Sequence, residues 1–316
     1  MKTRLTDLLG LAHPVIQAPM ALAAGGALAQ AVTQAGGLGM IGGGYCNSDW
    51  IMEQFDLADG ARVGCGFITW ALAENPSVLE AVLDRDPAAL FLSFGDPEPF
   101  SGSIKRAGVP LMCQVQTLRD AKRALASGAD VIVAQGSEAG GHGQARGTMS
   151  LVPEIADEIS RSGHSALLCA AGGISDGRGL AAARMLGADG VVIGTRFWAT
   201  QEALVQPRLM ERALASSGDE TLRTSVIDII RKMDWPSRYS CRVLNNELTA
   251  RWHGDEADLA QHVEDVSQAW SNAMAQGDPN IATPIVGEAI GLITDKPPAA
   301  EVLHQIMSQA HRLMPL

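Results

Sequence analysis

The sequence has few aromatic residues, a deficit of positive charge and no long apolar run. Phe, Trp and Tyr make up 4% of the 316 residues, so a core has to be built mainly from aliphatic side chains. Lys and Arg number 24 against 35 Asp and Glu, and the net charge of -11 argues against nucleic acid as the main partner. Hydrophobic residues reach 47%, which excludes a disordered chain.

No segment has the pattern of a membrane anchor or a secretion signal. A spanning helix needs about 20 apolar residues, and the short apolar run near the N-terminus is interrupted by Asp7. The cysteines are scattered and lack CxxC spacing, which excludes a zinc ribbon and argues against a disulfide framework. They are Cys46, Cys65, Cys113, Cys169 and Cys241. We therefore expect a cytoplasmic protein that binds neither metal nor membrane.

Short apolar runs alternate with Ala-rich stretches along the first 200 residues. Each run is continuously apolar and bounded by Gly or Pro, which is typical of parallel strands buried on both faces. The runs predict eight strands, at 14–18, 38–41, 63–67, 89–93, 110–115, 130–134, 166–171 and 190–194. The intervening stretches predict helices at 25–36, 48–58, 76–85, 117–127, 150–162 and 176–187. Eight such units favour an α/β fold of the (β/α)8, or TIM barrel, type over a doubly wound open sheet.

Residues 201–276 differ in composition from the rest of the chain. Glu, Arg, Gln and Ser become frequent, strand signals vanish, and Trp235, Trp252 and Trp270 lie here. We expect this stretch, called the cap segment below, to be a mostly helical subdomain over the C-terminal face of the barrel. Residues 1–200 and 277–316 would then form the barrel domain, with a final amphipathic helix from about Ala299.

Two glycine-containing turns predict an anion site. Gly172-Gly173 follows the seventh expected strand and Gly194-Thr195 follows the eighth, where TIM barrels commonly bind phosphate. Backbone N–H groups at such turns and at helix N-termini bind anions readily. The alternative is that these glycines only end the strands, but their equivalent positions in neighbouring units favour phosphate binding.

The stretch EAGGHG after the sixth expected strand places His142 among small residues. Small residues let a flat ligand approach the backbone closely, and a neutral imidazole can accept a proton near pH 7. His142 is therefore the candidate acid–base group, the alternative being a surface histidine. Glu138 is a second candidate, although a carboxylate that braces the loop fits its position better. No metal cluster or Ser/His/Asp constellation stands out.

Five motifs occur in a fixed order: QAPM at 17–20, AGGLGMIGGG at 35–44, AQGSEAGGHG at 134–143, AAGGI with DGRG at 170–179, and IGTRF at 193–197. Together they resemble the nitronate monooxygenases, formerly called 2-nitropropane dioxygenases. The same superfamily includes flavin-type enoyl-ACP reductases and NAD(P)H:quinone reductases. The resemblance extends over almost the whole chain and is specific for the superfamily, but much less so for one activity within it.

The resemblance implies a TIM barrel that binds non-covalent FMN. His142 matches the catalytic histidine of the family. The residues implied to bind the cofactor are Ala18, Pro19, Met20, Gly66, Gln114, Gln135, Gly140, Gly172, Gly173, Gly194 and Thr195. The chain departs from the family at one point, because it has Gly64-Cys65-Gly66 where many members have an Asn in a GVN motif. Backbone, water, Gln114 or Gln116 would have to replace that contact.

The resemblance implies oxidation of alkyl nitronates, and of nitroalkanes, by O2 to a carbonyl compound and nitrite. For a neutral nitroalkane, His142 would first remove the α-proton. A second hypothesis is an NAD(P)H-dependent FMN reductase of a quinone or an enoyl thioester. A third is a flavin-free lyase or isomerase barrel, against which QAPM and EAGGH argue together. A small-molecule substrate and O2 are the expected partners, with a homodimer left open.

Overall fold

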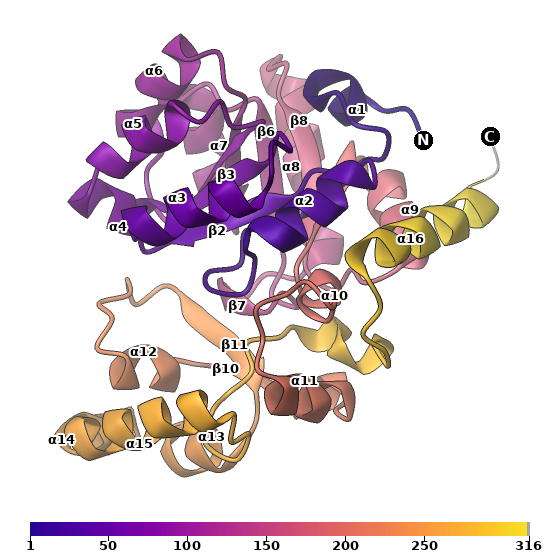
Figure 1. The fold of residues 1–316 in the computed structure, drawn as a ribbon. Coiled ribbons are helices and arrows are strands. Elements are labelled where there is room, and N and C mark those ends of the chain that lie inside the picture. Colours follow the sequence, from indigo (N-terminus) through magenta and orange to yellow (C-terminus); the bar gives the residue numbers. More distant parts are fainter. Residues whose placement is uncertain (315–316) are drawn as a thin grey trace.

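The computed structural model describes residues 1–314, and its centre is an eight-stranded parallel sheet (Figure 1). The strands run in the order β1-β9-β8-β6-β5-β4-β3-β2. A parallel bridge between Ile16 and Leu38 joins the two ends, so the sheet closes into a barrel. The bounds are β1 Val15–Gln17, β2 Met40–Gly44, β3 Gly64–Ile68, β4 Leu90–Ser93, β5 Leu111–Val115, β6 Val131–Gln135, β8 Leu167–Ala171 and β9 Gly190–Ile193. Each of the eight predicted strands overlaps one of them, which confirms the TIM barrel.

Helices follow the strands on the outside of the barrel (Figure 1). The six predicted ones correspond to α2 (Gly26–Gln34), α3 (Ser48–Leu57), α5 (Ser77–Leu83), α7 (Leu118–Ala126), α8 (Thr148–Ser162) and α9 (Gly177–Met185). The final helix, α16 (Ala299–Leu313), begins where predicted and packs against α9 and α2. Four short helices in the first 200 residues were not predicted: α1 (Arg4–Leu9), α4 (Thr69–Glu74), α6 (Glu98–Arg106) and α10 (Thr195–Trp198).

The inside of the barrel is filled mainly by aliphatic and sulfur-containing side chains, with Phe91 as its aromatic member. Met40, Met112 and Val133 pack there, all fully buried. At the N-terminal ends of the strands, Leu5 of α1 joins this cluster, and a Cβ on Gly190 would lie 2.3 Å from its Cδ2. One end of the barrel is therefore closed by α1, and a ligand has to approach from the carboxyl ends of the strands.

The cap segment contains five α-helices, one 3-10 helix and two strands in the described part of the chain. Its elements are α11 (Pro207–Leu214), η1 (Gly218–Glu220), β10 (Thr221–Thr224), α12 (Val226–Ile230), β11 (Ser240–Leu244), α13 (Glu247–Trp252), α14 (Glu256–Gln261) and α15 (Val263–Gln276). The expectation that strands are missing here is wrong. β10 and β11 pair antiparallel, and β11 also pairs with β7 (Gly141–Gly143), so the EAGGHG stretch ends in a strand and not in a free loop.

After the cap segment the chain returns to the barrel through the short helix η2 (Glu288–Leu292). The described helices include none with the length and apolar character required to cross a bilayer.

Candidate active site

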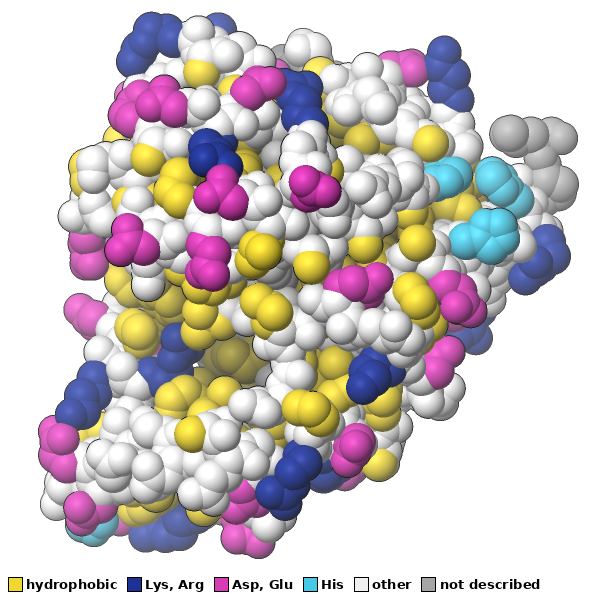
Figure 2. Space-filling model, in the orientation of Figure 1, with side chains coloured by type: hydrophobic (Ala, Val, Ile, Leu, Met, Phe, Trp, Pro, Cys, Tyr) yellow, Lys and Arg dark blue, Asp and Glu magenta, His cyan; other side chains and the backbone are white. Residues whose placement is uncertain are grey.

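A cavity of about 580 Å³ lies at the carboxyl ends of the strands, between the barrel and the cap segment. Figure 2 shows a hollow with hydrophobic side chains around it between the two lobes. All the residues predicted to form the site line this cavity: Ala18, Pro19, Met20, Gly66, Gln114, Gln135, Gly140, His142, Gly172, Gly173, Gly194 and Thr195. Its volume is within the range of small-molecule and cofactor sites.

The two glycine turns fit a ligand that approaches the backbone. Gly172 and Gly173 have φ angles of +99° and +72°, a conformation that favours glycine. Gly194 is different, because its φ of -97° is open to any residue and a Cβ there would meet no atom closer than 3.8 Å. Neither backbone strain nor protein packing therefore requires glycine at position 194. The space above it opens into the cavity, as a bound phosphate would need.

Two other predicted glycines have a packing explanation. A Cβ on Gly66 would lie 2.3 Å from Cγ of Pro19. A Cβ on Gly140 would lie 2.5 Å from the carbonyl carbon of Val286 and 2.6 Å from the nitrogen of Gly287. Both glycines line the cavity, yet the chain's own segments make the close approach that the sequence suggested for a ligand.

His142 lies on β7 and is held by a carboxylate from the cap segment. Its Nε2 is 2.8 Å from Oδ1 and 3.0 Å from Oδ2 of Asp228, a buried residue of α12. A carboxylate only accepts, so Nε2 carries the hydrogen and Nδ1 keeps its lone pair. The indole of Trp235 stacks on the imidazole at 3.4 Å between ring centroids and an interplanar angle of 5°. The ring is therefore fixed in orientation and tautomer.

Burial is the main influence on the charge of His142, whose side chain is 9% exposed. Desolvation lowers the pKa of His142 below its usual 6.5, while the hydrogen bond and charge of Asp228 oppose that shift. The net shift is downward, so the imidazole is neutral at pH 7 and can accept a proton.

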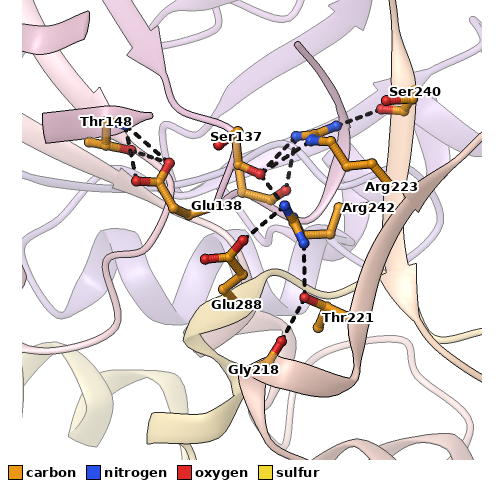
Figure 3. A network of polar contacts seen from close by, with 10 residues as sticks. Ser137, Glu138, Thr148, Gly218, Thr221, Arg223, Ser240, Arg242 and Glu288 are labelled. Carbon is orange, nitrogen blue, oxygen red and sulfur yellow. Dashed lines mark hydrogen bonds and ion pairs between the residues drawn. The ribbon is translucent and has the colours of Figure 1, made fainter. Parts of the chain in front are cut away.

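Two partly buried arginines of the three-stranded sheet hold the turn before His142 (Figure 3). The carbonyl of Ser137 accepts a 2.8 Å hydrogen bond from Arg242 Nε and bonds of 3.1 and 3.2 Å from Arg223. Arg242 also pairs with Glu288 at 2.8 Å. Burial and the neighbouring Arg242 lower the pKa of Arg223 to about 10, which still leaves it charged at pH 7. This cluster joins three segments that are distant in sequence.

Glu138 braces the same turn from the other side. Its carboxylate accepts hydrogen bonds from the backbone nitrogen of Thr148 at 3.0 and 3.1 Å and from the Thr148 hydroxyl at 2.9 Å. Figure 3 shows Glu138 directed to Thr148 and away from the arginines. These contacts favour the bracing interpretation of Glu138 over an acid–base role.

Of the three glutamines near the site, Gln114 and Gln135 line the cavity, whereas Gln116 is buried outside its lining. Gln116 is buried and donates to Gln135 Oε1 at 2.7 Å, while Gln135 Nε2 donates to the carbonyl of His142 at 3.1 Å. Gln114 lines the cavity, and its amide has no hydrogen-bond partner among residues 1–314. Of the two candidates to replace the family Asn, Gln114 is the one whose side chain is available to a ligand.

Sequence reasoning missed four side chains around His142. Asp228, Arg231 and Trp235 come from the cap segment, and Tyr45 follows β2. Tyr45, Arg231 and Trp235 line the cavity, whereas Asp228 lies behind His142. No motif marks them, since their positions depend on the pairing of β11 with β7. The one feature of the sequence that could have indicated a contribution from the cap segment was its three tryptophans, Trp235, Trp252 and Trp270.

Comparison with known proteins gives a consistent result. The family model for nitronate monooxygenase matches residues 2–61 and 70–309. A nitronate monooxygenase of Neurospora crassa is 32% identical, with 94% of this chain and 88% of the relative covered. The solved structure of FabK from Thermotoga maritima superposes with a TM-score of 0.86 at 28% identity, covering 99% and 97% of the two chains.

A structure of nitroalkane oxidase from Streptomyces ansochromogenes has a TM-score of 0.81 at 24% identity, covers 98% of both chains, and supports the fold alone. The family match, in contrast, extends over most of the chain and agrees with the motifs that line the cavity. This chain belongs to the nitronate monooxygenase family, whose members are flavin-dependent oxidoreductases.

Proposed function

We propose that the protein oxidises alkyl nitronates with O2 and bound FMN, giving a carbonyl compound and nitrite. The observation that carries the proposal is His142, a neutral base held by Asp228 at a cavity that also contains the two glycine turns. For nitroalkanes, the same histidine would generate the nitronate inside the cavity. The Neurospora relative carries the same activity in its name.

The residues present fit a flavin mononucleotide. The phosphate would bind at the backbone N–H groups of the Gly172-Gly173 and Gly194-Thr195 turns. The Thr195 hydroxyl accepts a 2.9 Å bond from the nitrogen of Gly287, which leaves its own hydrogen for the ligand. The ring would lie near Ala18-Pro19-Met20, with Gln114 as the polar side chain beside it. The flavin supplies the redox chemistry with the nitronate and O2.

Proton transfer is the contribution of the protein side chains. Nδ1 of His142 would accept the α-proton of a nitroalkane, and Asp228 would stabilise the imidazolium that forms. Trp235, stacked on the ring, prevents the imidazole from turning as its charge changes. A substrate that arrives as a nitronate has lost this proton already and needs only to be bound and oriented.

The second candidate is an NAD(P)H-dependent reductase. The likeness to FabK favours it, as does a part of the cavity beyond the glycine turns, lined by Leu209, Trp270 and Met274 of the cap segment. A nicotinamide or an extended acyl group could bind there. This candidate requires electrons from NADH or NADPH, whereas a nitronate is its own electron donor.

Anaerobic mixing of the yellow holoenzyme separates the two candidates. Ethylnitronate or 2-propylnitronate is added to one sample, and NADH or NADPH to another, while flavin absorbance is followed. Under the monooxygenase proposal, nitronate bleaches the flavin within one turnover time and the nicotinamides act slowly or not at all. The opposite pattern would move the assignment to the reductase. Extraction of FAD in place of FMN would contradict the cofactor proposal.

Three further expectations stay predictions. They are the division into a barrel domain (1–200 and 277–316) and a cap subdomain (201–276), a cytoplasmic location, and homodimer formation.

A further inference from the structure

Arg231 is the one Lys or Arg side chain among the described residues that line the cavity. Its side chain is partly buried and forms no ion pair or hydrogen bond within residues 1–314. The carboxylate of Asp228, three residues away, is hydrogen-bonded to His142, and that of Glu138, which also lines the cavity, is hydrogen-bonded to Thr148. A cavity with a mostly apolar wall thus contains a guanidinium that makes no direct ion pair with a carboxylate. Desolvated charge is costly unless something compensates it.

Arg231 has a defined position. Its guanidinium carbon lies 5.1 Å from the centre of the Tyr45 ring, a cation–π contact. The hydroxyl oxygen of Tyr45 accepts a 3.0 Å hydrogen bond from Nε1 of Trp235, so its own hydrogen is free to be donated. Burial raises the pKa of Tyr45 above 10.0, and the phenol therefore keeps that hydrogen at neutral pH.

These groups are adjacent to the proposed base. Trp235, which donates to Tyr45, is the same residue that stacks on His142. The charge of Arg231 also reaches His142, since it is among the causes that lower the pKa of that histidine. A cation and a neutral O–H donor are thus next to a group that can remove a proton.

We propose that Arg231 and the hydroxyl of Tyr45 form a subsite for the anionic oxygens of the substrate, the nitronate oxygens in the proposed reaction. The assignment rests on the proposed function and names the part of the cavity that recognises the charge. A nitronate carries its negative charge on arrival, so the subsite would contribute to binding. A nitroalkane acquires that charge only as His142 removes the proton, so the subsite would act in the transition state.

Loss of the subsite should therefore affect KM for a nitronate and kcat for a nitroalkane. Arg231→Gln should raise KM for ethylnitronate by about 10- to 100-fold, the range of hydrogen bonds to a charged group. With nitroethane, the same variant should lower kcat and leave KM within a few-fold. Tyr45→Phe should also raise KM for ethylnitronate and lower kcat for nitroethane, but by a smaller factor. The kinetic constants of Arg231→Lys should lie between those of wild type and Arg231→Gln.

A binding measurement makes the test independent of turnover. Sodium nitrate, a planar anion with oxygens like those of a nitronate, is titrated into the holoenzyme while tryptophan fluorescence is followed. Nitrate should change the fluorescence, compete with ethylnitronate, and bind about 10-fold or more weakly to Arg231→Gln. Lys232→Gln is the matched control, because Lys232 is exposed, pairs with Glu264 and is outside the cavity lining. It should bind nitrate like wild type.

Each outcome supports or overturns the subsite. Nitrate binding that is absent, or equal in wild type and Arg231→Gln, overturns it even if nitronate is turned over. Nitrate binding that depends on Arg231 in a protein that does not oxidise nitronates supports the subsite and contradicts the proposed function. Loss of flavin in Arg231→Gln, with thermal stability unchanged, would assign Arg231 to the cofactor and overturn the subsite. If Arg231→Gln is unstable, Arg231→Lys and Tyr45→Phe decide by the same criteria.

Discussion

The imidazole of His142 has one nitrogen bound to Asp228 and the other without a partner among residues 1–314. His142→Asn removes the base and keeps a polar side chain of similar reach. General-base catalysis contributes about 10²–10⁴-fold, so turnover of nitroalkanes should fall by about that factor. Nitronate turnover should fall much less, and the FMN content should not change. Steady-state rates on nitroethane and ethylnitronate, with flavin quantified after denaturation, measure this.

Other outcomes would give His142 a different role. Equal loss on both substrates with FMN retained would mean that His142 orients the substrate. Loss of FMN would place the residue in the wall of the flavin site. Full activity on both would mean that the EAGGH stretch is structural.

Asp228 is a positioning residue, since it acts through His142. Asp228→Asn removes the carboxylate that raises the pKa of His142 against the effect of burial. The acidic limb of the nitroalkane kcat/KM profile should therefore move to lower pH, because the imidazole loses its proton more easily. The rate at the optimum should fall by about 10- to 100-fold, as expected when a hydrogen bond to a charged group is lost.

The pH profile distinguishes positioning from a general structural effect. A variant with a lower rate but an unshifted acidic limb would show that Asp228 does not tune His142. Asp228→Glu, which restores the charge, should recover part of both the rate and the pH dependence.

At the level of single residues, the sequence predicted what lies on the barrel and missed what comes from the cap segment. His142 and the glycine turns follow strands, so the fold class alone brings them to one end of the barrel. Asp228 is 86 positions from His142, and their contact requires the β7–β11 pairing. That pairing has no sequence signature, because β7 is three residues long and two of them are glycines.

Among the structural elements, the turn between β9 and α10 offers the sharpest test of the cofactor site. A Cβ at Gly194 meets nothing closer than 3.8 Å, so Gly194→Ala and Gly194→Val should fold. Their flavin content should fall, more for Val than for Ala, since each side chain enters the space above the backbone. Flavin absorbance per protein, beside circular dichroism, checks this. Gly102→Ala on the exposed face of α6 is the control and should keep its flavin.

If Gly194→Val retained FMN in full, the phosphate would not bind at this turn. If it lost both flavin and circular dichroism, the glycine would be required by the fold, and Gly194→Ala would then decide the question.

The elements of the barrel were predicted well for a physical reason. A parallel strand buried on both faces is a continuous apolar run, such as VIVAQ in β6, and Gly or Pro marks its ends. β10 (TLRT) and β11 (SCRVL) have mixed burial and contain an arginine each, so no such run occurs. Short helices such as α1 and α4 have six residues and too little periodicity to be detected.

For the whole molecule, we expect a stability optimum between pH 6.5 and pH 9. His13 and His142 have folded-state pKa values below 6.5, mainly because of burial. Below pH 6.5 these histidines bind more protons in the unfolded chain than in the folded one. The free energy of unfolding therefore decreases as the pH falls from 6.5 toward the lowered pKa values of the folded state. On the alkaline side, burial raises the thiol pKa of Cys46 and Cys113 from 9.0 to about 12. The unfolded chain loses protons first above pH 9, which again favours unfolding.

Thermal unfolding of the protein between pH 5 and pH 10 measures this profile. The melting temperature should fall on both sides of the optimum, and His13→Asn should flatten the acidic side. His164→Asn, at an exposed position, should leave the profile as it is. A melting temperature that rises continuously toward pH 5 would contradict the role of the buried histidines.

The pairing of β11 with β7 has a consequence for how ligands enter and leave. Gly141, His142 and Gly143 are each matched to a residue of β11, so the cap segment shares a sheet with the strand that carries the proposed base. A hinged lid would have to break this sheet, and with it the Asp228 contact, in every catalytic cycle. Substrate and product therefore have to enter and leave through the opening of the cavity. A chimera with a cap from another family member would have to preserve the β7–β11 register to remain active.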